Sequence, residues 1–266
     1  MTTSPTILIT GASDGIGLET AKRLAADGAR LILHGRSPAK LDAAADAARA
    51  AGPDSEISTV VADLSDLEQV RAMAAAVRAE VDHLDVVLNN AGIFETPHVE
   101  TASGHDVRFI VNTIAPYLLT TLLLPVVPPT GRFVNLSSAA QAPVDLDAMT
   151  GAPRLSSFDA YAQSKLGLTM WNAHLAATHP DGPVFIAVNP GSYLGTKMVQ
   201  EGFGVAGNDV NIGVDILVRA SLDPTFADAT GRYWDNDNGR FAPPHPAGQN
   251  IADNAALAAA IDAFVA

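Results

Sequence analysis

The stretch that decides the fold is Thr10-Gly11-Ala12-Ser13-Asp14-Gly15-Ile16-Gly17, which continues an apolar run that starts at Thr6. A helical pattern begins at Ile16 and extends to Ala26. Three glycines between a strand and a helix let the backbone turn tightly and approach a pyrophosphate, which the free N–H groups and the helix dipole then stabilise. The stretch predicts a dinucleotide-binding turn, although glycines at a helix start also occur for conformational reasons alone.

Short apolar runs alternate with alanine-rich helical patterns along the rest of the chain. We expect strands over residues 6–10, 30–34, 56–62, 84–89, 131–136, 184–188 and 231–234. Helices are predicted over residues 16–26, 38–51, 67–80, 104–124 and 160–178. The alternation indicates an α/β fold, a doubly wound (Rossmann) parallel sheet of about seven strands flanked by helices. No Pro-, Gly- or Ser-rich linker divides the chain, so residues 1–266 are expected to form a single domain.

Two segments, residues 139–159 and 192–211, interrupt the alternation and are rich in Gly, Pro and small residues. In a doubly wound sheet both would follow the carboxyl ends of strands, where such folds bind ligands. We expect them to form substrate lids. They carry apolar side chains such as Leu146, Met149 and Met198 and few basic ones, which favours a small apolar carbonyl or alcohol substrate. The alternative is that these side chains merely pack the lid.

Composition excludes several classes of function. The net charge is −13 and the pI about 4.7, which repels nucleic acids and anionic membrane surfaces. The chain has no cysteine and no pair of histidines at metal-ligand spacing on a helix, so no metal is expected and redox chemistry must come from a bound cofactor. No run approaches the roughly 18 uninterrupted apolar residues of a membrane span. We expect a cytoplasmic protein with neither a membrane nor a nucleic acid as partner.

The end of the second strand, His34-Gly35-Arg36-Ser37, bears on the choice of cofactor. It lies about 20 residues after the glycine turn, where a carboxylate would bind a ribose hydroxyl of NAD. Gly35 offers no carboxylate, while Arg36 suits a phosphate monoester and Ser37 can add a hydrogen bond. The pattern favours NADP over NAD. Asp14 weakens this preference, and Arg36 could also be an ordinary surface charge.

Tyr161 and Lys165 lie four residues apart on a predicted helix, so they share one face. A free tyrosine has a pKa near 10, and an ammonium at roughly 5 Å stabilises its phenolate by about 3 kcal/mol, or roughly two pKa units. We therefore expect Lys165 to lower the pKa of Tyr161, which then acts as a general acid and base. An amphipathic surface pair is the common alternative for this spacing.

Three further polar residues stand at strand ends or among apolar neighbours. Ser137 and Ser138 end a predicted strand, where a hydroxyl could hold a substrate oxygen or cap a turn. Asn112 lies among apolar residues and is either a satisfied core amide or the holder of a water in a proton relay.

Together these residues resemble the short-chain dehydrogenase/reductase family. The resemblance covers the chain up to about Thr196 and rests on seven motifs in order: 10–17, Asp63-Leu64, Asn89 to Gly92, Asn112, Ser138, Tyr161 with Lys165, and Asn189-Pro190-Gly191. It implies hydride transfer between a nicotinamide cofactor and a carbonyl or alcohol carbon. A non-catalytic NADP-binding sensor of the same fold is the alternative.

By this resemblance, Ser138 orients the substrate carbonyl, Tyr161 is the acid/base, Lys165 lowers its pKa and binds the nicotinamide ribose, and Asn112 carries the water relay. Ser137 stays open as the alternative to Ser138. The cofactor-binding residues implied by the turn and the resemblance are Gly11, Ser13, Asp14, Gly15, Ile16, Gly17, Arg36, Ser37, Asp63, Leu64, Asn90, Ala91, Gly92, Tyr161, Lys165, Pro190, Gly191 and Thr196.

The sequence departs from the short form of the family in one segment. Ser138 and Tyr161 are 23 residues apart, so residues 139–159 contain an insertion. With the Gly231 to Trp234 stretch and the Pro-rich stretch that follows it, this insertion resembles the retinol-dehydrogenase-like branch without its membrane anchor. Family members commonly pair through two long helices, here 104–124 and 160–178, so we expect a homo-oligomer, either a dimer or a tetramer.

Overall fold

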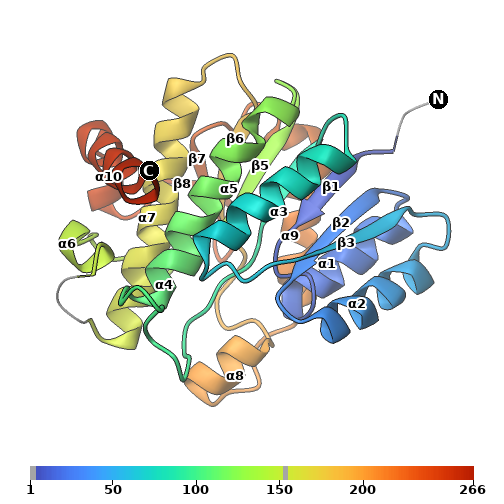
Figure 1. Ribbon diagram of the computed structural model, residues 1–266, viewed down its shortest axis with the longest axis horizontal. Helices are drawn as coiled ribbons and strands as arrows, with labels where there is room; N and C mark the ends of the chain where they lie inside the picture. Colours follow the sequence, from blue (N-terminus) through green and yellow to red (C-terminus); the bar gives the residue numbers. More distant parts are fainter. Residues whose placement is uncertain (1–3, 152–154) are drawn as a thin grey trace.

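A computed structural model describes residues 4–151 and 155–266 and contains one eight-stranded sheet (Figure 1). The strand order is β3-β2-β1-β4-β5-β6-β7-β8, and β8 pairs antiparallel with β7 while the other pairs are parallel. The strands are β1 (Thr6–Ile9), β2 (Arg30–Gly35), β3 (Ile57–Val61), β4 (Val86–Asn89), β5 (Arg132–Leu136), β6 (Val184–Asn189), β7 (Arg232–Asp235) and β8 (Arg240–Ala242). The strand order reverses between β1 and β4, the point at which doubly wound sheets bind ligands.

Helices cover both faces of the sheet (Figure 1). One layer holds α1 (Gly15–Ala26), α2 (Pro38–Ala51) and α9 (Asn211–Leu222), and the other holds α3 (Leu67–Glu80), α4 (Val107–Phe109), α5 (Ala115–Leu123) and α7 (Ser157–Thr178). The helix α10 (Ile251–Val265) packs on α7, α6 (Leu146–Met149) follows β5, and α8 (Lys197–Phe203) is set apart at the lower edge of the view. The predicted doubly wound α/β fold is confirmed.

Both layers are held by apolar side chains that alternate along the strands. Leu8 and Ile32 join the core beneath α3, α5 and α7, whereas Ile7 and Ile9 join the core beneath α1, α2 and α9. Burial on both faces explains why these strands read as continuous apolar runs in the sequence.

The structure corrects the sequence prediction in three respects. The sheet has eight strands rather than about seven, because the stretch before Pro243 forms the short antiparallel strand β8. The helix predicted over 104–124 begins at Val107, after a cap by Asp106, and passes through a π-helical turn over Ile110–Ile114. The second lid segment, residues 192–211, contains the helix α8, and the predictions missed α9 and α10.

One helical stretch in the described part of the chain, Val107–Val126, is long and apolar enough to cross a membrane. About three quarters of it, 72%, is buried inside the protein. A core helix of a soluble protein passes the same test, so this finding is weak evidence for a membrane span.

Three buried asparagines join β4, β5 and α7 through their side chains. Asn89 donates to Asn135 over 2.8 Å and to Thr120 over 3.0 Å, and Asn135 donates to Asn172 over 2.8 Å. All three asparagines are at most 2% exposed. Buried amides without partners are costly, so this chain of hydrogen bonds fixes α5 and α7 on the sheet.

We expect Asn135→Leu to lower the free energy of unfolding by about 3 kcal/mol, because the buried amides of Asn89 and Asn172 each lose one hydrogen-bond partner. Urea denaturation followed by circular dichroism measures the change. The exposed Arg78→Ala is the control and should stay within about 0.5 kcal/mol of the wild type. A wild-type midpoint for Asn135→Leu would show that the amide chain does not stabilise the fold.

Candidate active site

The glycine turn is tied to the segment after β4. Gly11 and Gly15 have φ of +66° and +55°, a region that favours glycine. Asn90 donates from its side-chain amide to the carbonyls of Thr10 and Gly11, over 2.8 and 3.1 Å. Thr10 Oγ1 accepts in return from the backbone N–H groups of Asn90 and Ala91. A Cβ on Gly17 would lie 2.4 Å from the Asn90 amide nitrogen, so the approach requires glycine.

The residues around this turn fit a dinucleotide phosphate. Asp14 caps α1 by accepting from Gly15 N over 2.7 Å, and the helix start that follows, Ile16 and Gly17, is where backbone N–H groups are free of helical partners. A Cβ on Gly15 would reach within 3.6 Å of Thr196, so a side chain there would fill the space between the turn and the lid. Such a bare backbone cradle at the start of a 12-residue helix suits an anion.

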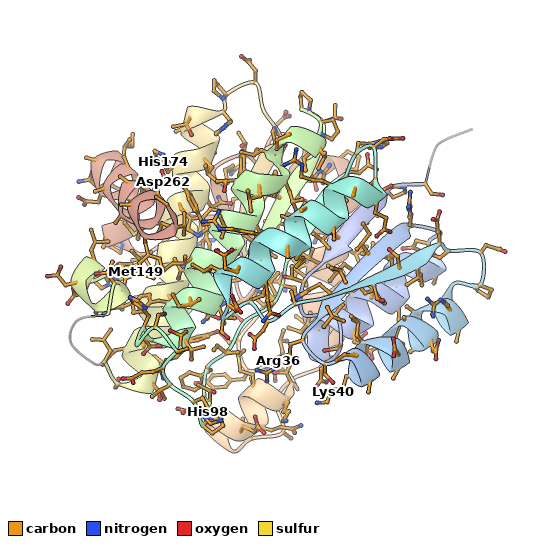
Figure 2. All side chains as sticks on the ribbon, viewed as in Figure 1. Arg36, Lys40, His98, Met149, His174 and Asp262 are labelled. Atoms are coloured by element: carbon orange, nitrogen blue, oxygen red, sulfur yellow. The ribbon has the colours of Figure 1, made fainter. Side chains whose placement is uncertain are left out.

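The predicted adenosine-side residues lie at the ends of β2 and β3. Arg36 is exposed just beyond β2, on the edge of the molecule that also carries α8 (Figure 2). Ser37 occupies the cap position of α2 without a side-chain capping bond, so its hydroxyl is not used by that helix. Asp63 accepts from Ser65, and Leu64 is buried. Ser13 stands against Gly35, 3.3 Å from where a Cβ would lie, and so joins the turn to this end of β2.

Tyr161, Ser138 and Lys165 converge as the resemblance implies. Tyr161 is hydrogen-bonded to Ser138, and the Lys165 ammonium lies 5.8 Å from the centroid of the Tyr161 ring. Lys165 is 3% exposed and donates to the carbonyl of Leu136 over 2.8 Å. Ser137 points elsewhere: its hydroxyl pairs with Thr169 over 2.7 Å inside the core. Of the two serines, Ser138 is the one beside the phenol.

The expected direction of the Tyr161 pKa is wrong. Burial raises the pKa of Tyr161 above 10, and the hydrogen bond with Ser138 only partly opposes this. Burial also lowers the pKa of Lys165 to about 8. The prediction counted the ammonium charge of Lys165 but not the loss of solvent around both groups. Burial therefore favours the neutral phenol form of Tyr161.

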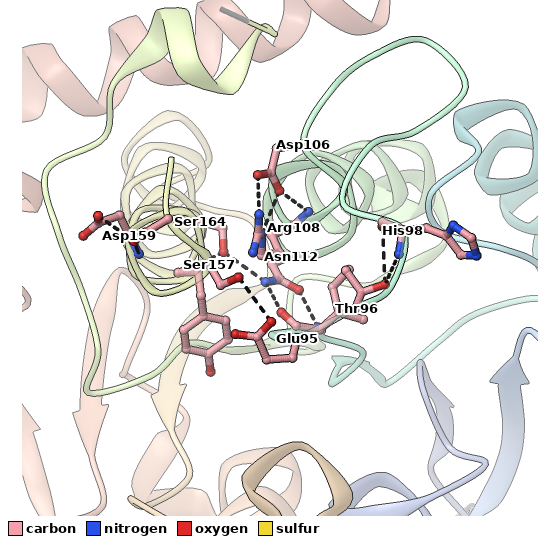
Figure 3. A network of polar contacts seen from close by, with 12 residues as sticks. Glu95, Thr96, His98, Asp106, Arg108, Asn112, Ser157, Asp159 and Ser164 are labelled. Atoms are coloured by element: carbon pink, nitrogen blue, oxygen red, sulfur yellow. Dashed lines mark hydrogen bonds and ion pairs between the residues drawn. The ribbon is translucent and has the colours of Figure 1, made fainter. Parts of the chain in front are cut away.

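Asn112 sits in the π-helical turn and its side chain is fully engaged (Figure 3). Its amide oxygen accepts from Ile93 N over 2.8 Å, and its amide nitrogen donates to Ile93 O and to Ser164 Oγ over 2.9 and 3.0 Å. Both amide hydrogens of Asn112 are therefore engaged within the protein.

Gly92 is the place where these groups meet. A Cβ on Gly92 would lie 3.2 Å from the Lys165 ammonium nitrogen and 3.4 Å from Asn112 Oδ1. The bare backbone after β4 therefore lets the lysine and the asparagine approach from α7 and from the π-helical turn.

Residues 192–211, the segment expected to form the second lid, pack against the glycine turn and Phe94. Pro190 and Gly191 follow β6, with Asn236 donating to the Pro190 carbonyl over 2.9 Å. Thr196 caps α8 by accepting from Val199 N over 3.4 Å. A Cβ on Gly202 of α8 would lie 2.5 Å from the Phe94 ring, so α8 rests directly on that ring. In the first lid, 139–159, residues 152–154 lie outside the described residues.

Sequence reasoning missed two residues of the site. Phe94 is 6% exposed, and its ring centroid lies 5.1 Å from that of Tyr161. Tyr233 donates from its hydroxyl to the Ser138 carbonyl over 3.1 Å and so supports the strand end that carries Ser138. An apolar residue just after Asn-Asn-Ala-Gly was a usable signal for Phe94, but only the sheet order brings Tyr233 to β5.

Comparison with known proteins agrees with this geometry. The family model described as short chain dehydrogenase matches residues 5–203. Mouse retinol dehydrogenase 12 is 37% identical over 86% of this chain and 76% of its own. A solved structure of an uncharacterized protein from Mycobacterium paratuberculosis has a TM-score of 0.80 at 28% identity, covering 98% of this chain and 93% of its own. A metagenomic short-chain oxidoreductase solved in complex with NADP has a TM-score of 0.64 at 29% identity, covering 84% and 93%.

The chain belongs to the short-chain dehydrogenase/reductase family of oxidoreductases, which use a nicotinamide cofactor. Within the family it falls in the retinol-dehydrogenase-like branch, as its sequence predicted.

The lowered pKa of Lys165 gives a prediction on stability. Below pH 8 the folded protein must hold a buried ammonium, a cost that is absent from the unfolded chain, where the lysine pKa is near 10.5. As the pH rises from about 8 towards 10.5, the folded state loses the proton first and gains stability relative to the unfolded state. From pH 7 to pH 10 we expect the free energy of unfolding of the wild type to rise by about 2 kcal/mol relative to Lys165→Met.

Urea denaturation of both proteins at the two pH values measures this difference. Comparison with Lys165→Met subtracts the titration of all other groups that the two proteins share. Parallel pH dependences of the two proteins would contradict the lowered pKa.

Proposed function

We propose that the protein is an NADP(H)-preferring carbonyl reductase or alcohol dehydrogenase that acts on hydrophobic ketones, aldehydes or secondary alcohols. The observation that carries the proposal is the convergence of Ser138, Tyr161 and Lys165 beside the glycine turn. A bound nicotinamide supplies or accepts the hydride. The residues of the chain then bind the substrate oxygen and transfer a proton to or from it.

Tyr161 is proposed to give its hydroxyl proton to the carbonyl oxygen during reduction and to take it back during oxidation. Ser138, already bonded to Tyr161, holds the same oxygen in place. The raised pKa of Tyr161 keeps this proton on the phenol, and the protonated phenol is the form needed for reduction. The Lys165 ammonium stabilises the phenolate left behind, because both groups are buried and poorly screened by water.

Replacement of the proton on Tyr161 needs a route from solvent. Lys165 is proposed to pass a proton by way of a water held near Asn112, the residue to which the family resemblance assigns a water relay. The two hydrogen bonds between the Asn112 side chain and the Ile93 backbone fix the π-helical turn relative to the segment after β4.

The preference for NADP is supported by the exposed Arg36 and by Ser37, which α2 does not use as a side-chain cap. Gly35 lies so close to Ser13 and Leu41, 3.3 Å from the position of a Cβ, that an acidic side chain would not fit there without movement. The metagenomic structural neighbour was solved in complex with NADP.

An apolar substrate is supported by the side chains around the phenol. The Phe94 ring lies 5.1 Å from that of Tyr161. Two further rings, Phe158 and Tyr193, lie in the segments expected to form lids and are 52% and 54% exposed, so these segments carry apolar surface. The name of the mouse relative, a retinol dehydrogenase, points to the same class of substrate.

We further propose a cytoplasmic location and a homo-oligomer. The first is supported by the burial of Val107–Val126 in the core. Light scattering tests the homo-oligomer by separating a dimer or tetramer from a monomer. The helix α10 packs on α7, and Tyr117 of α5 donates to Asp262 of α10 over 2.8 Å, so α10 covers part of the helix pair expected to form the interface.

We expect Tyr161→Phe to lower kcat by at least about 10²-fold, because the phenol proton has no replacement. The dissociation constant for NADPH should change little. Stopped-flow kinetics with a panel of hydrophobic ketones and aldehydes measures turnover, and fluorescence titration measures binding. Full activity of the variant would refute the assignment, while binding without turnover in the wild type across the panel would favour a cofactor sensor.

We expect Arg36→Ala to lower kcat/KM for NADPH by about tenfold or more, because a charged hydrogen bond to the 2′-phosphate is lost. The value for NADH should stay within about twofold, since that cofactor lacks the phosphate. Lys40→Ala, one turn into α2, is a matched control for loss of a nearby positive charge. Equal losses with both cofactors would argue against a phosphate contact.

A further inference from the structure

His34 is a buried polar residue of the site region to which the reaction assigns no role. It lies near the end of β2 and is 2% exposed. Its Nδ1 accepts from Gly11 N over 3.3 Å, and its Nε2 faces the Ala62 carbonyl at 3.0 Å. A backbone N–H only donates and a carbonyl only accepts, so the ring is neutral with its proton on Nε2.

These contacts place His34 between the glycine turn and the end of β3. Gly11 is the first residue after β1 with positive φ, so its N–H sets the direction in which the chain leaves the strand. The next N–H, that of Ala12, donates to the backbone carbonyl of His34 over 2.9 Å. His34 therefore holds two successive N–H groups of the turn, one through its ring and one through its backbone.

Protonation of the ring is incompatible with this arrangement. With a proton on Nδ1, two donors would face each other across the contact with Gly11, and one of them must move. Burial lowers the pKa of His34 below 6.5, which keeps the ring neutral at physiological pH. The hydrogen bond to Ala62 and the negative charge of Asp63 oppose this shift less strongly.

Other charged groups stand on the elements around His34. On the glycine turn, Asp14 bonds to Gly15 N, and at the start of α3 Asp66 caps the helix. On β2's own continuation, Arg36 points to solvent. None of these contacts involves an imidazole nitrogen, so the fixed partners of the ring are Gly11 and Ala62.

We propose that His34 is a positioning residue for the dinucleotide turn: its neutral ring holds Gly11 in the binding conformation, and dinucleotide affinity depends on that bond. The inference rests on the dinucleotide site of the proposed function but not on the substrate, on Tyr161 or on the preference for NADP.

Two amide variants separate the two bonds of the ring. In His34→Asn the side-chain oxygen can take the place of Nδ1 and accept from Gly11, while the bond to Ala62 is lost. In His34→Gln the longer side chain can place its nitrogen where Nε2 donates to Ala62, while the bond to Gly11 is lost. Neither amide titrates, and each variant keeps one of the two bonds.

The probe is NAD⁺ in isothermal titration calorimetry between pH 8 and pH 5.5, because its phosphodiesters do not titrate in this range, unlike the 2′-phosphate of NADP. We expect the wild type to bind more weakly as the His34 ring becomes protonated, by up to about fivefold once the hydrogen bond to Gly11 is lost. His34→Asn should bind like the wild type at pH 8 and show no pH dependence. His34→Gln should bind about fivefold more weakly at every pH.

Equal binding by the two variants at pH 8 would overturn the proposal, as would a wild-type affinity that stays constant or rises while NMR shows the His34 ring becoming protonated. Circular dichroism checks that both variants fold. The Gly11 amide proton of the cofactor-free wild type gives a reading that needs no ligand and no variant: its NMR shift should titrate together with the His34 ring. A Gly11 shift that stays unchanged while the His34 ring titrates overturns the proposal, whether or not the protein binds a dinucleotide. Failure of the wild type to bind any dinucleotide would instead refute the proposed function.

Discussion

The side-chain amide of Asn90 is the contact on which the site depends. It joins the ends of β1 and β4 at the point where the strand order reverses, by donating to Thr10 and Gly11. The contact is possible because Gly17 has no side chain, since a Cβ there would overlap the amide. One asparagine and one glycine thus fix the turn, and the same segment after β4 continues through Gly92 to Phe94, beside Lys165 and Tyr161.

Burial, rather than pairing of opposite charges, determines the protonation of the catalytic groups. It raises the pKa of Tyr161 and lowers that of Lys165, so each group is pushed towards its neutral form. The lysine ammonium donates to a backbone carbonyl, that of Leu136, and within residues 4–151 and 155–266 it forms no ion pair with a carboxylate. A charge on either group therefore carries a desolvation cost.

The glycine turn and the Tyr161–Lys165 spacing could be predicted from sequence because each is local: a few residues carry the geometry. The boundaries of α2 and α3 were predicted correctly for the same reason, since Pro38 and Asp66 mark the helix starts. The strand β8 was missed because three residues before a proline carry too little pattern. The alanine-rich α10 has little polar–apolar alternation and depends on packing against α7. The direction of the Tyr161 pKa depends on burial, which spacing does not reveal.

The contact between Gly202 and Phe94 couples the position of α8 to the exposure of the site to water. The Phe94 ring touches α8 and lies beside the ring of Tyr161. An outward movement of α8 would expose the Phe94 ring, next to the Tyr161 phenol, to water, which is unfavourable. An apolar ligand that covers the Phe94 ring offsets this penalty, whereas a polar ligand does not. The packing of α8 on Phe94 thus agrees with the proposal of an apolar substrate.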